Sequence, residues 1–137
     1  MALEYRTEKY KDLIQSLIKE TAHAFPEAEI VIAQQYIPGC TFRNSKEIFN
    51  RQNEASAARR DCTYQALVYD TQLSAIRELH LDTRNNSLSR RLHTIQMQYI
   101  TGFDDNGFYD HIHSTRPGSE RIGKYIAEKV RRIIDAN

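Results

Sequence analysis

The stretch "EIVIAQQYIPG", residues 29–39, decides the fold of this 137-residue chain. It holds four consecutive apolar residues, Ile30 to Ala33, and three of them are β-branched. A short, unbroken run of this kind is typical of a strand that is buried on both faces, as strands of parallel sheets are. Pro38 and Gly39 predict a turn that closes the stretch. We therefore expect a parallel sheet with helices on both of its faces.

Helices are predicted at both ends of the chain. Residues 3–24 carry apolar side chains at three- and four-residue steps, and Pro26 disfavours helix beyond them. The members of this stripe are Tyr10, Leu13, Ile14, Leu17, Ile18 and Thr21. The last helix is expected from about Pro117 to Asp135. Its predicted buried stripe consists of Ile122, Ile126, Val130, Ile133 and Ile134.

In the middle of the chain, one helix and one strand are predicted, and the assignment of a third segment stays open. Residues 45–60 are expected to form a second helix, with Ser45 as its N-cap and Ile48 and Phe49 facing inward. Residues 63–71, "TYQALVYDT", are expected to form a second strand. Residues 72–101 fit helix in some places and either helix or strand in others. This order of elements predicts an α/β fold, a three-layer sandwich with a short parallel sheet flanked by helices.

Composition bounds the function. Hydrophobic residues make up 40% of the chain and the net charge is +1, so one globular domain spanning residues 1–137 is expected. The charge balance does not imply a nucleic acid, and no apolar run reaches the ~20 residues of a membrane span. No export signal stands at the N-terminus. We therefore expect an intracellular, cytoplasmic protein in which Cys40 and Cys62 are free thiols, with one disulfide as the alternative.

The segment "DHIHSTRPGSERIG", residues 110–123, resembles the last conserved block of the SGNH (GDSL-type) hydrolases. That block has an Asp, a His three residues later, a Gly five residues after the His, and a small residue five further on. Here these positions are Asp110, His113, Gly118 and Gly123. The resemblance implies the flavodoxin-like SGNH fold. It extends over nearly all of the chain, but only this block is specific.

The resemblance also implies a chemistry. A Ser hydroxyl needs a base to become nucleophilic at neutral pH, and His is suited to that role. By resemblance His113 is the base, Asp110 orients its imidazole ring, and the substrate is a small ester. No cofactor and no metal are implied.

The chain departs from the family where the nucleophile belongs. Neither the Gly-Asp-Ser block nor a G-x-N-D motif occurs, so the Ser and the donors of the oxyanion hole are missing. The chain thus looks like an SGNH domain truncated at its N-terminus. Two hypotheses follow. One is an ester hydrolase whose Ser another segment or chain supplies. The other is a catalytically inactive SGNH-like module, a pseudoenzyme, that binds protein or RNA.

Other residues have ordinary interpretations beside functional ones. His111 and His113 have an H-x-H spacing that can bind zinc, although no further ligand shows a matching spacing. Asp70 would end the second predicted strand, where α/β folds bind ligands, but the commoner role of such an Asp is to accept hydrogen bonds from loop amides. The cluster of Arg84, Arg90, Arg91 and His93 could contact phosphate, and a solvated helix face is the commoner explanation.

Truncation has a consequence for assembly. Without its neighbouring strand, the segment "EIVIAQQY" (residues 29–36) would form an apolar sheet edge. Such edges pair with other chains. We therefore expect a homodimer or a partner chain that completes the sheet.

Overall fold

The computed structural model describes residues 2–36, 40–44, 47–50, 62–82, 84, 86–100, 107 and 113–136. The predicted turn at Pro38 and Gly39 lies outside these ranges, and so does Asp110. The elements follow in the order α1 (Ala2–Ala24), β1 (Ile30–Ala33), β2 (Thr41–Asn44), β3 (Glu47–Asn50), α3 (Cys62–Leu81), α4 (Asn86–Arg91), β4 (Leu92–Ile95), the 3-10 helix η2 (Met97–Tyr99) and α5 (Arg116–Asp135).

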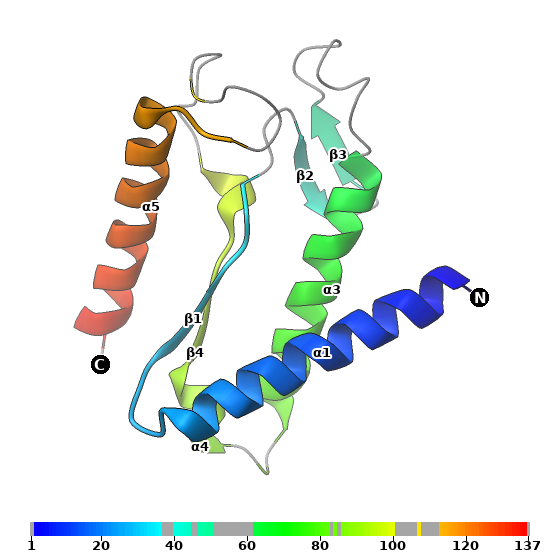
Figure 1. Ribbon diagram of the computed structural model, residues 1–137, viewed down its shortest axis with the longest axis vertical. Coiled ribbons are helices and arrows are strands. Elements are labelled where there is room, and N and C mark those ends of the chain that lie inside the picture. Colours follow the sequence, from blue (N-terminus) through cyan, green and yellow to red (C-terminus); the bar gives the residue numbers. More distant parts are fainter. Residues whose placement is uncertain are drawn as a thin grey trace.

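A two-stranded parallel sheet forms the centre of the fold. β1 pairs with β4, with Ile30 opposite Leu92 and Ala33 opposite Ile95. The helix α5 lies on one side of these strands, and α1 and α3 lie on the other (Figure 1). The predicted strand at Ile30–Ala33 and its parallel pairing are confirmed, and the chain has an α/β fold with helices on both sides of a short sheet.

Alternation along the strands produces two cores. Ile30 and Leu92 pack with residues of α1, α3 and α4, among them Ile18. Val31 and Ile95 instead belong to the cluster that contacts α5. Successive side chains of a strand point to opposite faces, so a strand that contacts helices on both sides has apolar residues on both faces. This explains the apolar run from Ile30 to Ile32, whereas Ala33 is exposed.

The first helix confirms its predicted range, and it confirms its predicted buried face only in part. Ile18 and Ala22 are buried and Ile14 packs beside them, whereas Leu13 and Leu17 are 61% and 65% exposed. The helix is held to α3 by polar contacts as well. Lys11 Nζ lies 2.9 Å from a Glu78 carboxylate oxygen. The hydrogen bond from Lys11, with a second from Gln15, lowers the pKa of Glu78.

Two predictions for the middle of the chain are wrong. Residues 63–71 are part of α3, not a strand, because the buried positions of the whole segment recur at three- and four-residue steps. These include Cys62, Ala66, Tyr69, Ala75, Ile76 and Leu79. The helix expected over residues 45–60 is contradicted at Glu47–Asn50, which pairs with Thr41–Asn44 as an antiparallel hairpin. Residues 51–61 lie outside the described ranges.

The expectation of free thiols is also wrong. Cys40 and Cys62 form a disulfide, with their Cα atoms 5.6 Å apart and both side chains buried. The bond joins the residue before β2 to the first residue of α3. Sequence spacing could not reveal this pair, because the two cysteines lie 22 residues apart and on different elements.

The last helix begins one residue before its predicted start. Thr115 is its N-cap, and its Oγ1 accepts a hydrogen bond from the backbone N–H of Gly118. Ile122, Ile126 and Val130 pack toward the sheet as predicted, whereas Ile134 is 62% exposed. None of the helices in the described ranges combines the length and hydropathy needed to cross a lipid bilayer.

Candidate functional site

One end of the molecule collects the parts that α/β folds use for binding. The strands β1 and β4 end there, and the helices α3 and α5 begin there (Figure 1). Ligands of open parallel sheets bind outside the carboxyl ends of the strands. We therefore take this carboxyl end of the sheet as the candidate site.

His113 lies at this end, two residues before the N-cap Thr115 of α5, and its side chain is exposed. Its predicted partner Asp110 falls outside the described residues, as does His111. The pairing of His113 with Asp110 stays a prediction.

Hydroxyl groups next to His113 are used in the start of α5. Thr115 Oγ1 accepts the Gly118 N–H at 3.2 Å. Ser114 Oγ and Ser119 Oγ share a hydrogen bond of 2.7 Å. The Thr115 backbone N–H donates to the Gly107 carbonyl oxygen at 3.0 Å. Thr115 thus caps the helix, and Ser114 is hydrogen-bonded to a side chain of its first turn.

Amide side chains follow β1, and sequence reasoning missed them. Gln34 is the first residue after the strand and is only 2% exposed. Its Nε2 donates to the Tyr69 carbonyl oxygen at 3.3 Å and to Gln72 Oε1 at 3.0 Å. Gln72 Nε2 in turn donates to the Tyr10 hydroxyl at 3.0 Å. A chain of hydrogen bonds thus runs from the end of β1 across α3 to α1.

A second group of amides follows β4. Gln98 Nε2 donates to Gln96 Oε1 at 3.2 Å, and the Tyr125 hydroxyl of α5 donates to the Gln96 carbonyl oxygen at 3.4 Å. Gln34 Oε1 and Gln98 Oε1 are buried, and neither finds a hydrogen-bond donor in the described part of the chain. The patterns "IAQQY" and "TIQMQ", each a strand followed by amides, were the available sequence signal.

Two tyrosines add neutral hydroxyl groups to this region. Burial raises the pKa of Tyr69 strongly, and the nearby Tyr36 raises it further. Burial also raises the pKa of Tyr36. Both phenols therefore stay protonated at neutral pH. Amides and neutral phenols bind polar groups by hydrogen bonds but do not transfer protons readily near pH 7.

The other residues singled out from the sequence lie elsewhere. Asp70 is within α3, so its expected place at the end of a strand is wrong. Arg91 ends α4, and its Nη1 donates to the carbonyl oxygens of Phe25 at 2.9 Å and Ala28 at 2.7 Å. His93 Nε2 lies 2.5 Å from a carboxylate oxygen of Glu29. Arg84 pairs with Asp82, so three of the four basic residues make structural contacts, and Arg90 is exposed.

The described residues offer few groups that could bind a metal ion or act as a thiol nucleophile. No cluster of three or more His, Cys, Asp or Glu side chains suited to a metal ion occurs among the residues that the structure describes. The chain has two cysteines, and the disulfide uses both. A cysteine nucleophile would first require reduction of that bond.

Comparison with known proteins does not assign this chain to a family. No family model, no curated protein and no solved structure matches this chain. The assignment to the SGNH hydrolases is therefore a proposal carried by Asp110, His113 and Gly118 of this sequence.

Proposed function

We propose that this chain is an SGNH-like module that retains the Asp110–His113 block and acts by binding rather than by hydrolysing esters on its own. The observation that carries the proposal is the state of the groups that could replace the missing Ser. The hydroxyls of Ser114 and Thr115 beside His113 are bonded within the start of α5, and both cysteines are in a disulfide.

The surroundings of the site support binding for a second reason. Acyl transfer gains most of its rate from donors aimed at the developing oxyanion, each worth ~10²–10³ in rate. The sequence lacks the Gly and Asn blocks that supply these donors in the family. The end of the sheet has Gln34, Gln96 and Gln98 instead. The amide nitrogens of Gln34 and Gln98 donate within the chain, and their Oε1 atoms, which find no donor in the described part of the chain, are acceptors that cannot stabilise an oxyanion.

The test is the hydrolysis of a short-chain chromogenic acetate ester by the chain, by His113→Ala and by His23→Ala as a matched control. His23 is an exposed residue of the last turn of α1, far in the sequence from the candidate site. We expect all three proteins to give the same rate, equal to the background. Turnover by the chain and by His23→Ala that is lost in His113→Ala would show a complete catalytic site and overturn the proposal.

The alternative of a hydrolase completed by another segment or chain has its own test. Ester turnover would then appear only when the completing polypeptide is added, and His113→Ala would abolish it. Supplying a Ser and oxyanion donors should raise the rate by orders of magnitude, since both terms are large. An unchanged background rate in the mixture would count against that polypeptide as the missing part.

A protein partner is favoured by exposed apolar side chains on α1. Leu13 and Leu17 lie one turn apart, and both are more than half exposed. Contiguous apolar surface on a soluble domain commonly marks a protein contact. Among the described strands β4 is the one neighbour of β1, which keeps the expected homodimer or sheet-completing partner as a prediction.

Light scattering at increasing protein concentration tests this partner. We expect the mass to rise toward that of a dimer, and Leu13→Ser with Leu17→Ser should shift the transition to higher concentration. A monodisperse monomer at high concentration would argue against self-association. Binding to RNA instead would show an affinity that falls steeply with added salt.

A further inference from the structure

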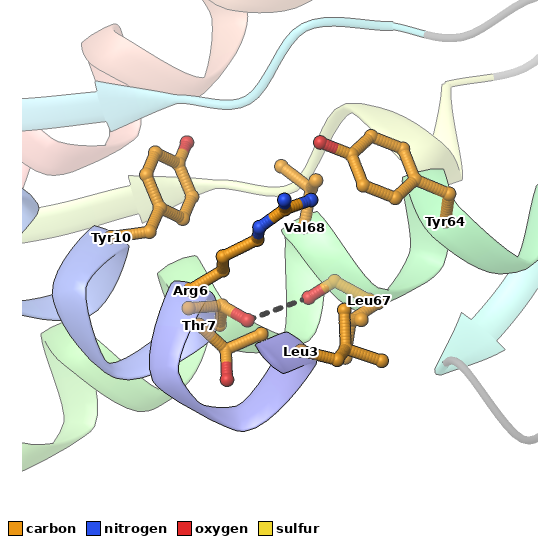
Figure 2. A pocket seen from close by; sticks show the side chains of 8 residues that line it. Leu3, Arg6, Thr7, Tyr10, Tyr64, Leu67 and Val68 are labelled. Carbon is orange, nitrogen blue, oxygen red and sulfur yellow. Dashed lines mark hydrogen bonds between the residues drawn. The ribbon is translucent and has the colours of Figure 1, made fainter. Parts of the chain in front are cut away.

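A pocket of about 310 Å³ lies between α1 and α3, apart from His113. Its floor and walls come from the first three turns of α1 and the first half of α3 (Figure 2). The lining residues are Leu3, Arg6, Thr7, Tyr10, Tyr64, Leu67, Val68 and Thr71. The set is mostly apolar or aromatic, with a single charged group.

Arg6 is the charged residue among those that line the pocket. Figure 2 shows its side chain extending across the pocket between Tyr10 and Tyr64, with Leu67 and Val68 nearby. Within the described residues, the guanidinium has no carboxylate in ion-pair contact. Of the two acidic residues in its own stretch of the helix, Glu8 pairs with Lys11. Among the described residues, Glu4 makes no ion pair with Arg6 either. A positive charge beside apolar surface therefore faces the pocket.

We infer that this pocket binds the carboxylate of a medium-chain fatty acid of eight to ten carbons, with Arg6 pairing with the carboxylate and the aliphatic chain lying along Leu3, Leu67 and Val68. The inference goes beyond the proposed function, because it does not involve His113. The planar guanidinium fork matches a carboxylate in a bidentate pair. A phosphate dianion would require more positive charge than one arginine supplies.

The size of the pocket sets the chain length. A volume of 310 Å³ corresponds to about ten water molecules at ~30 Å³ each. Ten to twelve non-hydrogen atoms, as in octanoate and decanoate, approach that capacity. An aliphatic chain also adapts to the open groove between two helices, and its burial supplies the affinity.

The first experiment is calorimetric titration of the chain with sodium hexanoate, octanoate and decanoate, each kept below micelle formation. We expect the Kd to fall by up to about fourfold for every added CH₂, the factor for full burial of that group. The neutral analogue 1-octanol should bind about five- to tenfold more weakly than octanoate, because it cannot pair with Arg6. An affinity that ignores chain length, or equal affinities for octanoate and 1-octanol, would overturn the inference.

Matched variants locate the site. Arg6→Gln should weaken octanoate about five- to tenfold and remove the preference over 1-octanol, whereas Arg77→Gln on the exposed surface of α3 should stay within twofold. Leu3→Ser should weaken decanoate about threefold or more, and Leu81→Ser, at an exposed leucine of α3 outside the pocket, should not.

A second copy of the chain could occupy this pocket in place of a fatty acid. If a second copy of the chain filled it, decanoate would bind more weakly at higher protein concentration and would dissociate dimers seen by light scattering. That result would replace the fatty carboxylate by a protein contact. A Kd independent of protein concentration, with the Arg6→Gln effect intact, supports the inference.

Discussion

A Cβ atom added to Gly118 would lie 1.9 Å from the carbonyl oxygen of Gly107. The same oxygen accepts the Thr115 backbone N–H at 3.0 Å. The first turn of α5 and the backbone at Gly107 are therefore in direct contact, and only a residue without a side chain fits at position 118. This contact gives the Gly of the SGNH-like block a structural reason that does not depend on catalysis.

Gly118→Ala should lower the free energy of unfolding by about 1–3 kcal/mol, since the added methyl group meets backbone rather than a movable side chain. The matched control is Gly123→Ala, five residues later in α5, where no atom lies within 4 Å of the added Cβ. That change should raise the free energy of unfolding by about 0.5–1 kcal/mol, because Ala favours helix. Urea denaturation measures both, and equal effects of the two variants would refute the tight contact.

Removal of the disulfide should destabilise the chain by about 3 kcal/mol, the value expected for a closed loop of some 20 residues. Cys40→Ser with Cys62→Ser tests this by urea denaturation, and a reducing agent should not affect the double variant. Thiol titration of the native, oxidised protein should detect no reactive group. Two free thiols in the native protein purified without reductant would contradict the bond.

Arg91→Gln should lower the free energy of unfolding by about 1.5–3 kcal/mol. The guanidinium bonds carbonyl oxygens of Phe25 and Ala28 where the chain leaves α1 and approaches β1, and these acceptors would lose a charged donor. The neighbouring Arg90 is exposed, so Arg90→Gln should change stability by less than about 0.5 kcal/mol. Equal unfolding midpoints for the two variants would show that the Arg91 contacts add nothing.

Alkaline pH should destabilise the fold through Tyr69. Burial raises the folded-state pKa above the value of ~10 for an unfolded chain, so the stabilisation is complete below pH ~10 and is lost as the pH rises further. Tyr69→Phe should therefore show a shallower loss of stability from pH 10 to 11.5, by up to about 1.4 kcal/mol per pH unit. Tyr5, which is 68% exposed, provides the control Tyr5→Phe, and an unchanged slope in Tyr69→Phe would rule out this linkage.

The parts of the fold that could be predicted are those with a signal inside one element. The β-branched run at Ile30–Ala33 and the periodic apolar residues of α1 and α5 each specify their own structure. β4 could not be predicted with confidence, because "LHTI" is a short segment that also fits a helix, and its pairing with β1 depends on residues far away in the sequence.

The strand expected at residues 63–71 shows the limit of a short window. Ala66 to Tyr69 alone resembles a buried strand, whereas the buried positions from Cys62 to Leu79 together show the period of a helix. The candidate site likewise contains residues that the sequence predicts and residues that it does not. The place of His113 before α5 followed from its block, but buried amides such as Gln34 look like ordinary loop residues until their contacts are seen.

The disulfide also changes how the chain can find its fold. Ile30 pairs with Leu92, so closing the parallel sheet requires the ordering of a loop of about 60 residues. The Cys40–Cys62 bond removes some 20 residues from that path and shortens it to about 40. Loop-closure entropy then falls by roughly 0.4 kcal/mol, which corresponds to about a twofold faster search if closure limits the rate. Oxidation before sheet formation would thus make this protein a faster folder as well as a more stable one.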